Sequence, residues 1–475
     1  MHTTVLNPTI WLLAALVATS VVAALRGQSA RLAFGRVLQA AARIPLLLAL
    51  GLAAIGGLGS RLVLGYLAPG TYAEEVLAAR SFLSARLLYH GDDRRDFSTW
   101  LSEEPAPISP WTLPGLTVCQ ASAVESRPQF YTAQGHSPVL LVASVPIVAA
   151  GGGRALYVIV SLGSLVSLVG IALAFGRAAG VPPRSTTAAI LLLALAGWQP
   201  VLAGVRQGDA VIIVSGLVVA AWTLLRTGDD LKGGFAAGLA GILLLPAMVL
   251  LIPVGLRSRR ALTASLATLT LGAGVTVAAA GPLVFADYAR STLATARLYA
   301  SSPMAYSALG QLLRLDPQSL APVVWAALAA LVVTIALALR PRGGSRDNAQ
   351  STARAAERFD ITMAMFAALA FLLVPVAWSQ HASLLVVPLA VLLGRTLSID
   401  RPWTLAIWAG LALLISLPDN AAVRLGLALK LTSDMTTMAV LPPAPVWAAA
   451  GLWAWLLAAS VRTLRPEPRA STLWP

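Results

Sequence analysis

The chain has 475 residues, of which 57% are hydrophobic and only 11% are charged, and its formal net charge is +14. Soluble domains carry about 25% charged residues, so this composition excludes a soluble protein and indicates several membrane spans. The positive charge does not indicate a nucleic-acid partner, because the arginines are scattered through short loops between apolar runs. The single cysteine, Cys119, excludes an intramolecular disulfide and a cysteine-based zinc site.

The apolar runs predict an all-α integral membrane fold in which residues 1–475 form one polytopic domain with about 13 transmembrane helices. About 20 apolar residues are needed to cross the ~30 Å hydrocarbon core of a bilayer. In chain order, the expected spans are 9–25, 45–66, 137–151, 154–175, 185–204, 208–225, 233–255, 261–281, 321–339, 361–378, 382–394, 402–417 and 443–461.

The charges of the connecting loops predict how these spans are oriented, because Lys and Arg concentrate in short cytoplasmic loops. Loop 26–44, the Arg-rich segment 257–260, the linker 340–360 and the C-terminal tail are all basic. Thirteen alternating spans place all four on the cytoplasmic side. Loop 67–136 then lies outside, and its eight acidic residues against five arginines agree with that position.

Two segments fit this topology poorly. Arg177 and Arg184 fall on the outer side, against the rule for basic loops. Gln207 and Asp209 fall at the cytoplasmic mouth of their span, far from any site on the outer side. Either these two residues belong to a helix break with a re-entrant segment, or the spans near them are wrongly assigned.

Two outer loops, 67–136 and 283–320, are too long to be simple connectors, and long loops often carry function. We expect them to form the active-site face. Each contains a segment with helical spacing of apolar residues, at 74–88 and 287–300, which predicts interfacial helices. Segment 340–360 is rich in Gly, Ser, Arg and Asn and is expected to be a cytoplasmic linker.

No phosphate-binding loop, dinucleotide-binding or zinc-protease motif occurs in the sequence. Several other landmarks do occur in a distinctive order. A Glu-Glu pair opens the first long outer loop, and "GHSPVLLVASVPIV", "VLAGVRQGDA", a Gly-rich helix with an internal Pro, "SSPMAYSALGQLLRL" and "LLVPVAWSQHASLLVVPLAVLL" follow it. In this order the landmarks resemble glycosyltransferase family 87 (DUF2029-like), whose members are GT-C type membrane mannosyltransferases and arabinofuranosyltransferases.

The resemblance implies an inverting transfer of a sugar, most often mannose, from a polyprenyl-phosphate-sugar donor to a lipid-linked or glycan acceptor. It also implies a multi-pass protein of the bacterial plasma membrane with an extracytoplasmic active site that contacts membrane lipids. The sequence departs from the family pattern at five places. His136, Ser137 and Pro138 stand where an aromatic residue and two prolines are usual, and a Lys often present in the Gly-rich helix is missing. A Glu stands where Asp is usual, Asp209 stands where Asn is expected, and Gln380 with His381 replaces a His pair.

Glu74 and Glu75 are the candidate general bases that deprotonate the acceptor, because a carboxylate partly desolvated at a helix mouth can take up a proton. Taken without the resemblance, a Glu pair at a helix start is more simply explained by the helix dipole. His381 is a candidate catalytic residue, since an ionisable group near membrane depth marks function. Its alternative role is a hydrogen bond to a helix-end carbonyl. The candidate substrate-binding residues are Arg290, Arg297 and Arg314 for the lipid phosphate, and Trp378, Gln380 and His136.

No cofactor is implied. A divalent metal ion at His90, Asp92, Asp93 and Asp96 is possible, but their spacing matches no metal motif. Two other classes stay open, namely a polytopic transporter or flippase of a lipid or glycan, and a non-catalytic relative of the family. A transporter buries charged groups at the bilayer midplane and carries paired broken helices. Here the spans are nearly free of charge, which favours chemistry at the outer face.

Overall fold

The computed structural model describes residues 7–67, 75–76, 78–79, 82–83, 136–299, 349–375, 377–417 and 444–464, and every regular element in these ranges is helical. The first half of the chain forms α1 (Pro8–Leu25), α2 (Ala30–Ala41), α3 (Ile44–Leu67), α7 (Pro138–Ala178), α8 (Thr186–Ala196), α9 (Gln199–Gln207), α10 (Val211–Thr227) and α11 (Asp230–Leu243). The second half forms η3 (Leu245–Leu250), α12 (Leu251–Arg257), α13 (Arg259–Ala280), α14 (Val284–Tyr299), α17 (Ala349–Leu373), η4 (Ser379–Leu385), α18 (Val386–Ile399), α19 (Pro402–Ser416) and α22 (Ala444–Leu464).

Five helical runs in the described part are long and apolar enough to cross a membrane, namely α1, α3, α7, α13 and Ser379–Ile399. A sixth arises if α8 and α9, which meet at an angle of 55°, count as one broken span. The all-helical membrane architecture is therefore confirmed for the described residues. The count of thirteen spans is not confirmed, and the expected span 321–339 lies outside the described residues.

The packed core of the bundle surrounds α17. Almost every side chain from Ile361 to Phe371 is buried, and α17 packs against α10, α18, α22, η3 and η4. A helix that is apolar on all sides belongs in the centre of a bundle. In contrast, α3 is almost unburied and exposes Leu52 and Ile55, as a helix in contact with lipid does.

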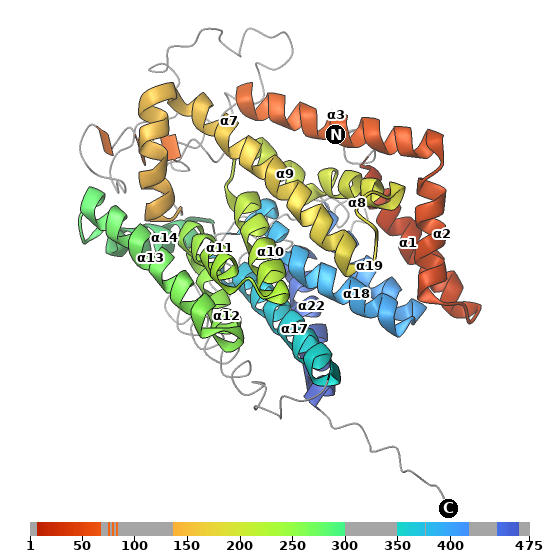
Figure 1. Cartoon of the computed structure of the whole chain (residues 1–475). Coiled ribbons are helices and arrows are strands. Elements are labelled where there is room, and N and C mark those ends of the chain that lie inside the picture. Colours follow the sequence, from red (N-terminus) through yellow and green to blue (C-terminus); the bar gives the residue numbers. More distant parts are fainter. Residues whose placement is uncertain are drawn as a thin grey trace, which may run out of the picture.

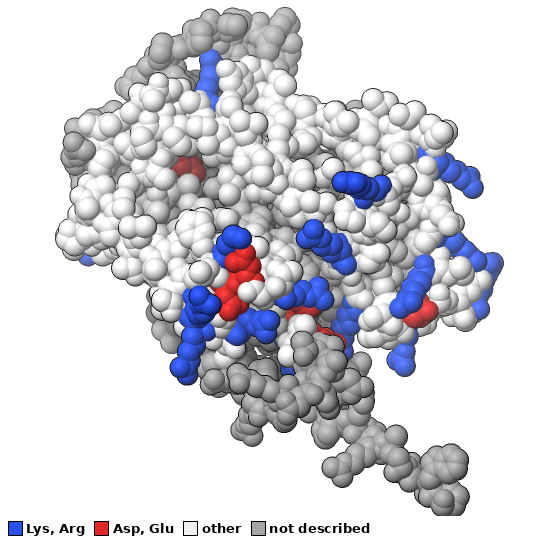
Figure 2. Space-filling view, viewed as in Figure 1, with Lys and Arg blue, Asp and Glu red and all other residues white. Residues whose placement is uncertain are grey.

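One end of the bundle, which we call the basic end, is held together by ion pairs and hydrogen bonds. The backbone N–H of Arg31, in α2, donates to Asp400 Oδ1 after α18 (2.8 Å). Asp360 in α17 accepts from the indole of Trp222 (2.8 Å) and pairs with Arg226 (3.3 Å), both at the end of α10. Figure 2 shows Lys and Arg gathered over the lower and right-hand part of the molecule, where α2, α12, α17 and α18 lie in Figure 1.

Helix α7 crosses the bundle once, although its sequence predicts two spans. Gly152 has φ 69° and ψ −174°, a conformation that glycine adopts readily, and it divides α7 into two segments that meet at a sharp bend in Figure 1. The second segment ends at the basic end, where Ala178 packs against Gly394 of α18. The structure has one continuous candidate span at Pro138–Ala178, and the prediction that 137–151 and 154–175 each cross the membrane is not confirmed.

The segment 230–257 enters and leaves the bundle at the same end. Helix α11 stops at Leu244 in front of Pro246, which cannot continue the hydrogen-bonding pattern, and η3 and α12 return along it. Ser258 then donates a hydrogen bond to Asp230 Oδ2 (2.5 Å), so the two ends of the segment lie together. The prediction of one straight span at 233–255 is therefore wrong, and the segment is a re-entrant hairpin.

These two corrections resolve the misfits of the predicted topology. If α7 crosses once and the hairpin does not cross, the residues between them lie on the opposite side from the one predicted. Arg177 and Arg184 therefore join the basic end with the other arginine-rich loops, as the rule for basic loops requires. Asp209 moves to the opposite end, where α9 packs against η4.

We predict that cysteine labelling will report this arrangement. In a Cys119→Ser background, Arg36→Cys and Arg184→Cys place single thiols at exposed sites on the basic end, and Leu283→Cys places one at the opposite end. A membrane-impermeant maleimide should label the first two on the same side and the third on the other. Labelling of Arg184→Cys together with Leu283→Cys would contradict the single crossing of α7.

We predict that Gly65→Ala destabilises the protein by about 1–3 kcal/mol, as overpacked cores typically do. A Cβ at Gly65 would collide with the Tyr157 hydroxyl and would lie 2.5 Å from the backbone oxygen of Arg206. Gly59→Ala is the matched control in the same helix, because its Cβ meets nothing within 4 Å. Thermal unfolding in detergent should show a lower Tm for Gly65→Ala only, and equal Tm values would disprove the close contact.

Candidate active site

A buried carboxylate and an imidazole meet where α7 begins. His136 precedes the N-cap residue Ser137, whose hydroxyl accepts from the N–H of Leu140 (3.3 Å). This turn places His136 Nδ1 2.6 Å from Oε1 of Glu75. Glu75 is only 3% exposed, and its Oε2 is buried with no hydrogen-bond partner among the described residues. His136 thus binds one carboxylate oxygen of Glu75, and the other oxygen can accept a hydrogen bond from a ligand.

A second buried carboxylate lies between α9 and α10. Gly208 ends α9 in the left-handed conformation (φ 65°), and the chain turns there into Asp209. Asp209 Oδ1 accepts from the N–H of Val211 at the start of α10 (2.9 Å), and Oδ2 accepts from Gln380 Nε2 (3.1 Å). Asp209 is 6% exposed and Gln380 is 3% exposed. The loop between two helices is therefore tied to a third element, η4.

The short helix η4 presents His381 to both carboxylate sites. Its Nδ1 accepts from the backbone N–H of Trp378 (3.2 Å), so a neutral ring carries its proton on Nε2. His381 interacts electrostatically with Asp209 and with His136. One turn further, Ser383 forms a hydrogen bond with Ser215 of α10 (2.8 Å), which holds η4 in place.

We call Glu75, His136, Asp209, Gln380 and His381 the polar cluster. Its members come from segments that are up to about 300 positions apart in the sequence. They form two hydrogen-bonded pairs, Glu75 with His136 and Asp209 with Gln380, and the His381 imidazole interacts electrostatically with Asp209 and His136. Burying two carboxylates and two imidazoles costs free energy, and such groups in membrane proteins usually serve function. The cluster lies at the end of the bundle opposite the basic end, and it can accept a proton, donate one and bind hydroxyl groups.

Two arginines lie around Tyr66 and Tyr157, which connect α3 and α7 to α9. The Tyr157 hydroxyl donates to the backbone oxygen of Val205 in α9 (3.0 Å), and the Tyr157 ring lies 6.5 Å from that of Tyr66. The guanidinium of Arg154 lies 5.3 Å above the Tyr66 ring. Arg206, in the last turn of α9, is half-buried and forms no hydrogen bond or ion pair with other described residues. Both cations are available to an anion.

The other predicted site residues are not members of the polar cluster, and some of them lie outside the described residues. Arg290 is exposed on α14 and pairs with Asp287 (3.5 Å). Arg297 lies on the same helix, but its side chain is not among those described. Trp378 is half-buried and contributes its backbone to His381. The remaining predicted positions lie outside the described residues: Glu74, Arg314, Cys119 and the possible metal-binding segment 90–96.

Sequence reasoning placed four of the five cluster residues among its candidates and misjudged one. Asp209 could have been identified from the sequence, because it is a charged residue inside an apolar run. The predicted number of membrane crossings placed it at the cytoplasmic end, away from the expected site, so it was not chosen. Arg154 and Arg206 were missed, because a lone arginine beside an apolar run resembles any loop cation. In the part of the chain that the structure describes, no group of three or more His, Cys, Asp or Glu side chains is arranged to hold a metal ion.

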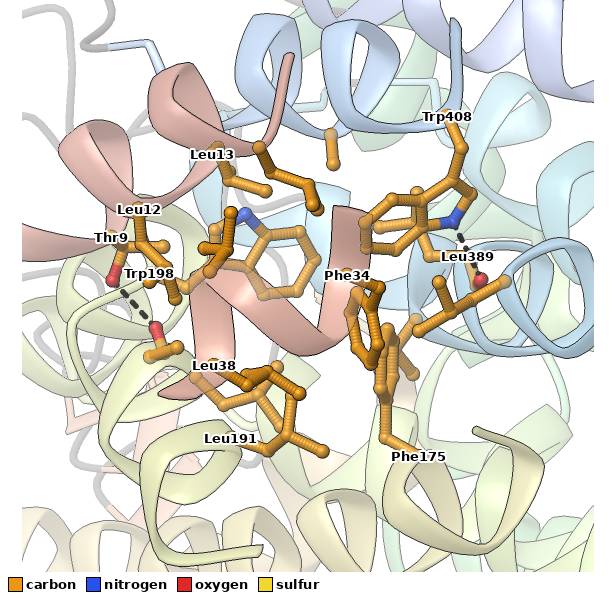
Figure 3. A pocket seen from close by; sticks show the side chains of 17 residues that line it. Thr9, Leu12, Leu13, Phe34, Leu38, Phe175, Leu191, Trp198, Leu389 and Trp408 are labelled. Carbon is orange, nitrogen blue, oxygen red and sulfur yellow. Dashed lines mark hydrogen bonds between the residues drawn. The ribbon is translucent and has the colours of Figure 1, made fainter. Parts of the chain in front are cut away.

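A separate apolar pocket lies between α1, α2, α8, α18, α19 and the end of α7 (Figure 3). Thr9 supplies a hydroxyl to its wall, and this group donates to the backbone oxygen of Ala194 (2.7 Å). The Trp408 indole donates to the backbone oxygen of Leu389 (2.8 Å). The pocket therefore offers hydrocarbon contacts and no acid or base. Helix α9, whose nine residues span about 13 Å, separates its Trp198 edge from Asp209.

Comparison with known proteins identifies the region that forms most of this site. Residues 136–359 match the model of Glycosyltransferase family 87, and they include His136, Asp209, Arg154 and Arg206. Neither the curated proteins nor the solved structures gave a match. The family suggested by the order of sequence landmarks is thus confirmed, and it implies that the protein is a glycosyltransferase with a sugar donor and an acceptor. The chain is a membrane protein whose residues 136–359 match glycosyltransferase family 87.

Proposed function

We propose that the protein transfers a sugar, which we take to be mannose, from a polyprenyl-phosphate-sugar donor to a hydroxyl of a lipid-linked or glycan acceptor, with Glu75 as the general base. The observation that carries this proposal is the state of the Glu75 carboxylate. His136 holds Oε1, whereas Oε2 is buried and unpartnered among the described residues. A buried acceptor atom without a donor is costly unless a ligand supplies one, and an acceptor hydroxyl is such a ligand.

The reaction needs one displacement. Glu75 Oε2 takes the proton of the acceptor hydroxyl while the oxygen of that hydroxyl bonds to the anomeric carbon of the donor sugar. The bond from that carbon to the phosphate oxygen breaks, and polyprenyl phosphate leaves with the bonding electrons. A single in-line displacement inverts the configuration at the anomeric carbon. A positioned base contributes on the order of 10² to 10⁴ in rate.

The other members of the cluster have supporting roles in this proposal. His136 orients the Glu75 carboxylate through the contact at Oε1, which leaves Oε2 to take up the proton. His381, with its proton on Nε2, is placed to donate a hydrogen bond to the donor, while Gln380 binds a sugar hydroxyl and Trp378 lines the approach. Glu74 stays a second candidate base in the sequence.

Arg154 and Arg206 support a phosphate-linked donor. A guanidinium matches the geometry of a phosphate and is the side chain best suited to bind one. Both residues lack carboxylate partners among the described residues. Arg290, Arg297 and Arg314 are further candidates for contacts with the lipid phosphate or the headgroups around it. The apolar pocket of Figure 3 offers hydrocarbon surface suited to a lipid chain.

The distribution of charge supports an extracytoplasmic site in a bacterial plasma membrane and a GT-C type arrangement. The arginine-rich loops gather at the basic end, which the positive-inside rule assigns to the cytoplasm. The polar cluster lies at the other end of the bundle, where polyprenyl-linked sugars are displayed for assembly of cell-envelope glycans. The long loops 67–136 and 283–320 begin at this end and extend the same face in this proposal.

A lipid or glycan transporter is a second candidate, because two broken helices meet at the cluster. The pair α8 and α9 bends by 55°, and η4 interrupts the run from α17 to α18. In transporters such breaks bind substrate at the midplane between two repeats. Here the buried charges lie at one end of the bundle, which favours transfer. Movement of a labelled lipid across proteoliposomes without formation of a new glycosidic bond would favour transport instead.

We predict that Glu75→Gln lowers kcat of sugar transfer by about 10²-fold or more, with little change in the donor KM. The amide keeps the shape and the hydrogen bond to His136 but cannot take up a proton. Transfer from a radiolabelled polyprenyl-phosphate mannose to a lipid acceptor measures the effect. Glu74→Gln is the matched control and should retain most activity; full activity in both variants would refute a Glu base at this position.

We predict that Arg206→Gln and Arg154→Gln each raise the donor KM by about 10-fold or more, because a hydrogen bond to a charged group contributes about 1.5–3 kcal/mol. Arg184→Gln, at an exposed position on the basic end, is the control and should change KM less than twofold. Donor titrations under single-turnover conditions separate binding from chemistry. Unchanged KM values in Arg206→Gln and Arg154→Gln would exclude these arginines from phosphate binding.

A further inference from the structure

The orientation of the Gln380 side-chain amide is fixed by its neighbour. Gln380 Nε2 donates to Asp209 Oδ2 (3.1 Å), and Gln380 forms no other hydrogen bond with the described residues. An ionised carboxylate only accepts hydrogen bonds, so it can face the NH₂ group of an amide but not its oxygen. The Asp209 charge is itself favoured by the N-terminus of α10, where Oδ1 accepts from Val211 N–H (2.9 Å).

In this orientation Gln380 Oε1 can still accept a hydrogen bond from a ligand. The neighbouring imidazole, His381, already uses its Nδ1 to accept from Trp378. Gly204 of α9 lies against the base of the Gln380 side chain, since a Cβ at Gly204 would be 3.4 Å from Gln380 Cβ. An acceptor oxygen cannot pair with a phosphate oxygen, but it can pair with a hydroxyl that donates.

We propose that Asp209 is a specificity-determining residue, which holds Gln380 so that Oε1 accepts a hydrogen bond from one hydroxyl of the transferred sugar. This inference rests on the proposed function, since it assigns the sugar rather than the lipid phosphate to this part of the site. It separates two kinds of recognition in the proposed site. The arginines Arg154 and Arg206 face anionic oxygens, whereas Gln380 selects a hydroxyl donor.

The polarity of this contact can be reversed without a large change of shape. In Asp209→Asn, the Asn oxygen still accepts from Val211, and its NH₂ group now requires the Gln380 oxygen. The Gln380 amide then turns over and presents Nε2 to the sugar. In the double variant Asp209→Asn/Gln380→Glu, the Asn NH₂ group pairs with one Glu oxygen, and the other oxygen again faces the sugar as an acceptor.

The experiment measures kcat/KM of the full-length chain in detergent for polyprenyl-phosphate mannose and for its 2-, 3-, 4- and 6-deoxyfluoro analogues. Fluorine cannot donate a hydrogen bond, so one analogue should be a poor substrate. For this analogue, the ratio of kcat/KM for the parent donor to kcat/KM for the analogue should be at least about tenfold higher in the wild type than in Asp209→Asn. The inductive effect of fluorine cancels in this comparison between variants. The double variant should recover the wild-type preference, and Gln380→Met, which lacks both polar groups, should lose it.

The outcomes separate this inference from the proposed function. Absence of transfer by the wild-type protein overturns the proposed function and this inference with it. Transfer by the wild type with the same fluoro-analogue ratios in Asp209→Asn overturns only the role of Asp209. A lower Tm of Asp209→Asn with unchanged ratios in the active fraction has the same meaning, because a structural role alone does not reorder the analogues.

Discussion

The hydrogen bond between the Gln380 amide and the Asp209 carboxylate joins two helix breaks that the rest of the site depends on. One break lies between α9 and α10, and the other is η4. Inside a membrane the backbone groups freed by a break must find partners in the protein, because the hydrocarbon offers none. Asp209 binds the start of α10 with one oxygen and η4 with the other, so a single side chain stabilises both breaks and brings His381 to its position.

The site then follows from bringing together groups that are individually costly to bury. Glu75 and His136 stabilise one another across the start of α7, while Asp209, Gln380 and His381 do so across η4. Among the described residues, Glu75 Oε2 is buried without a partner, Gln380 forms its one hydrogen bond through Nε2, and the guanidinium of Arg206 forms none. These are an acceptor for a proton, an acceptor for a hydroxyl and a donor for an anion, which together match the groups of a phosphate-linked sugar and its acceptor.

The helix count shows where sequence reasoning about membrane spans fails. Hydropathy reports how apolar a segment is, but not whether it crosses. Gly152 and Pro246 turn apolar segments back within the protein, where neighbouring helices cover the backbone. The prediction counted one crossing too many in α7 and one too many at the hairpin 230–257. The second extra crossing cancels the first, so only the residues between these two segments are assigned to the other side. Arg177 and Arg184 already indicated this error in the sequence. Four basic loops were predicted on the cytoplasmic side, and only the loop with these two arginines was predicted on the outer side.

The sequence by itself determined the helical membrane architecture, the basic character of one side, the family and most of the polar residues at the site, because composition, loop charge and motif order are local properties of the chain. The tertiary structure decided which of these residues meet. Glu75 and Gln380 lie about 300 positions apart, and only the folding of α7 and η4 around α9 brings their side chains into one cluster. The orientation of the Gln380 amide was likewise beyond the sequence, because it depends on a carboxylate 171 positions away.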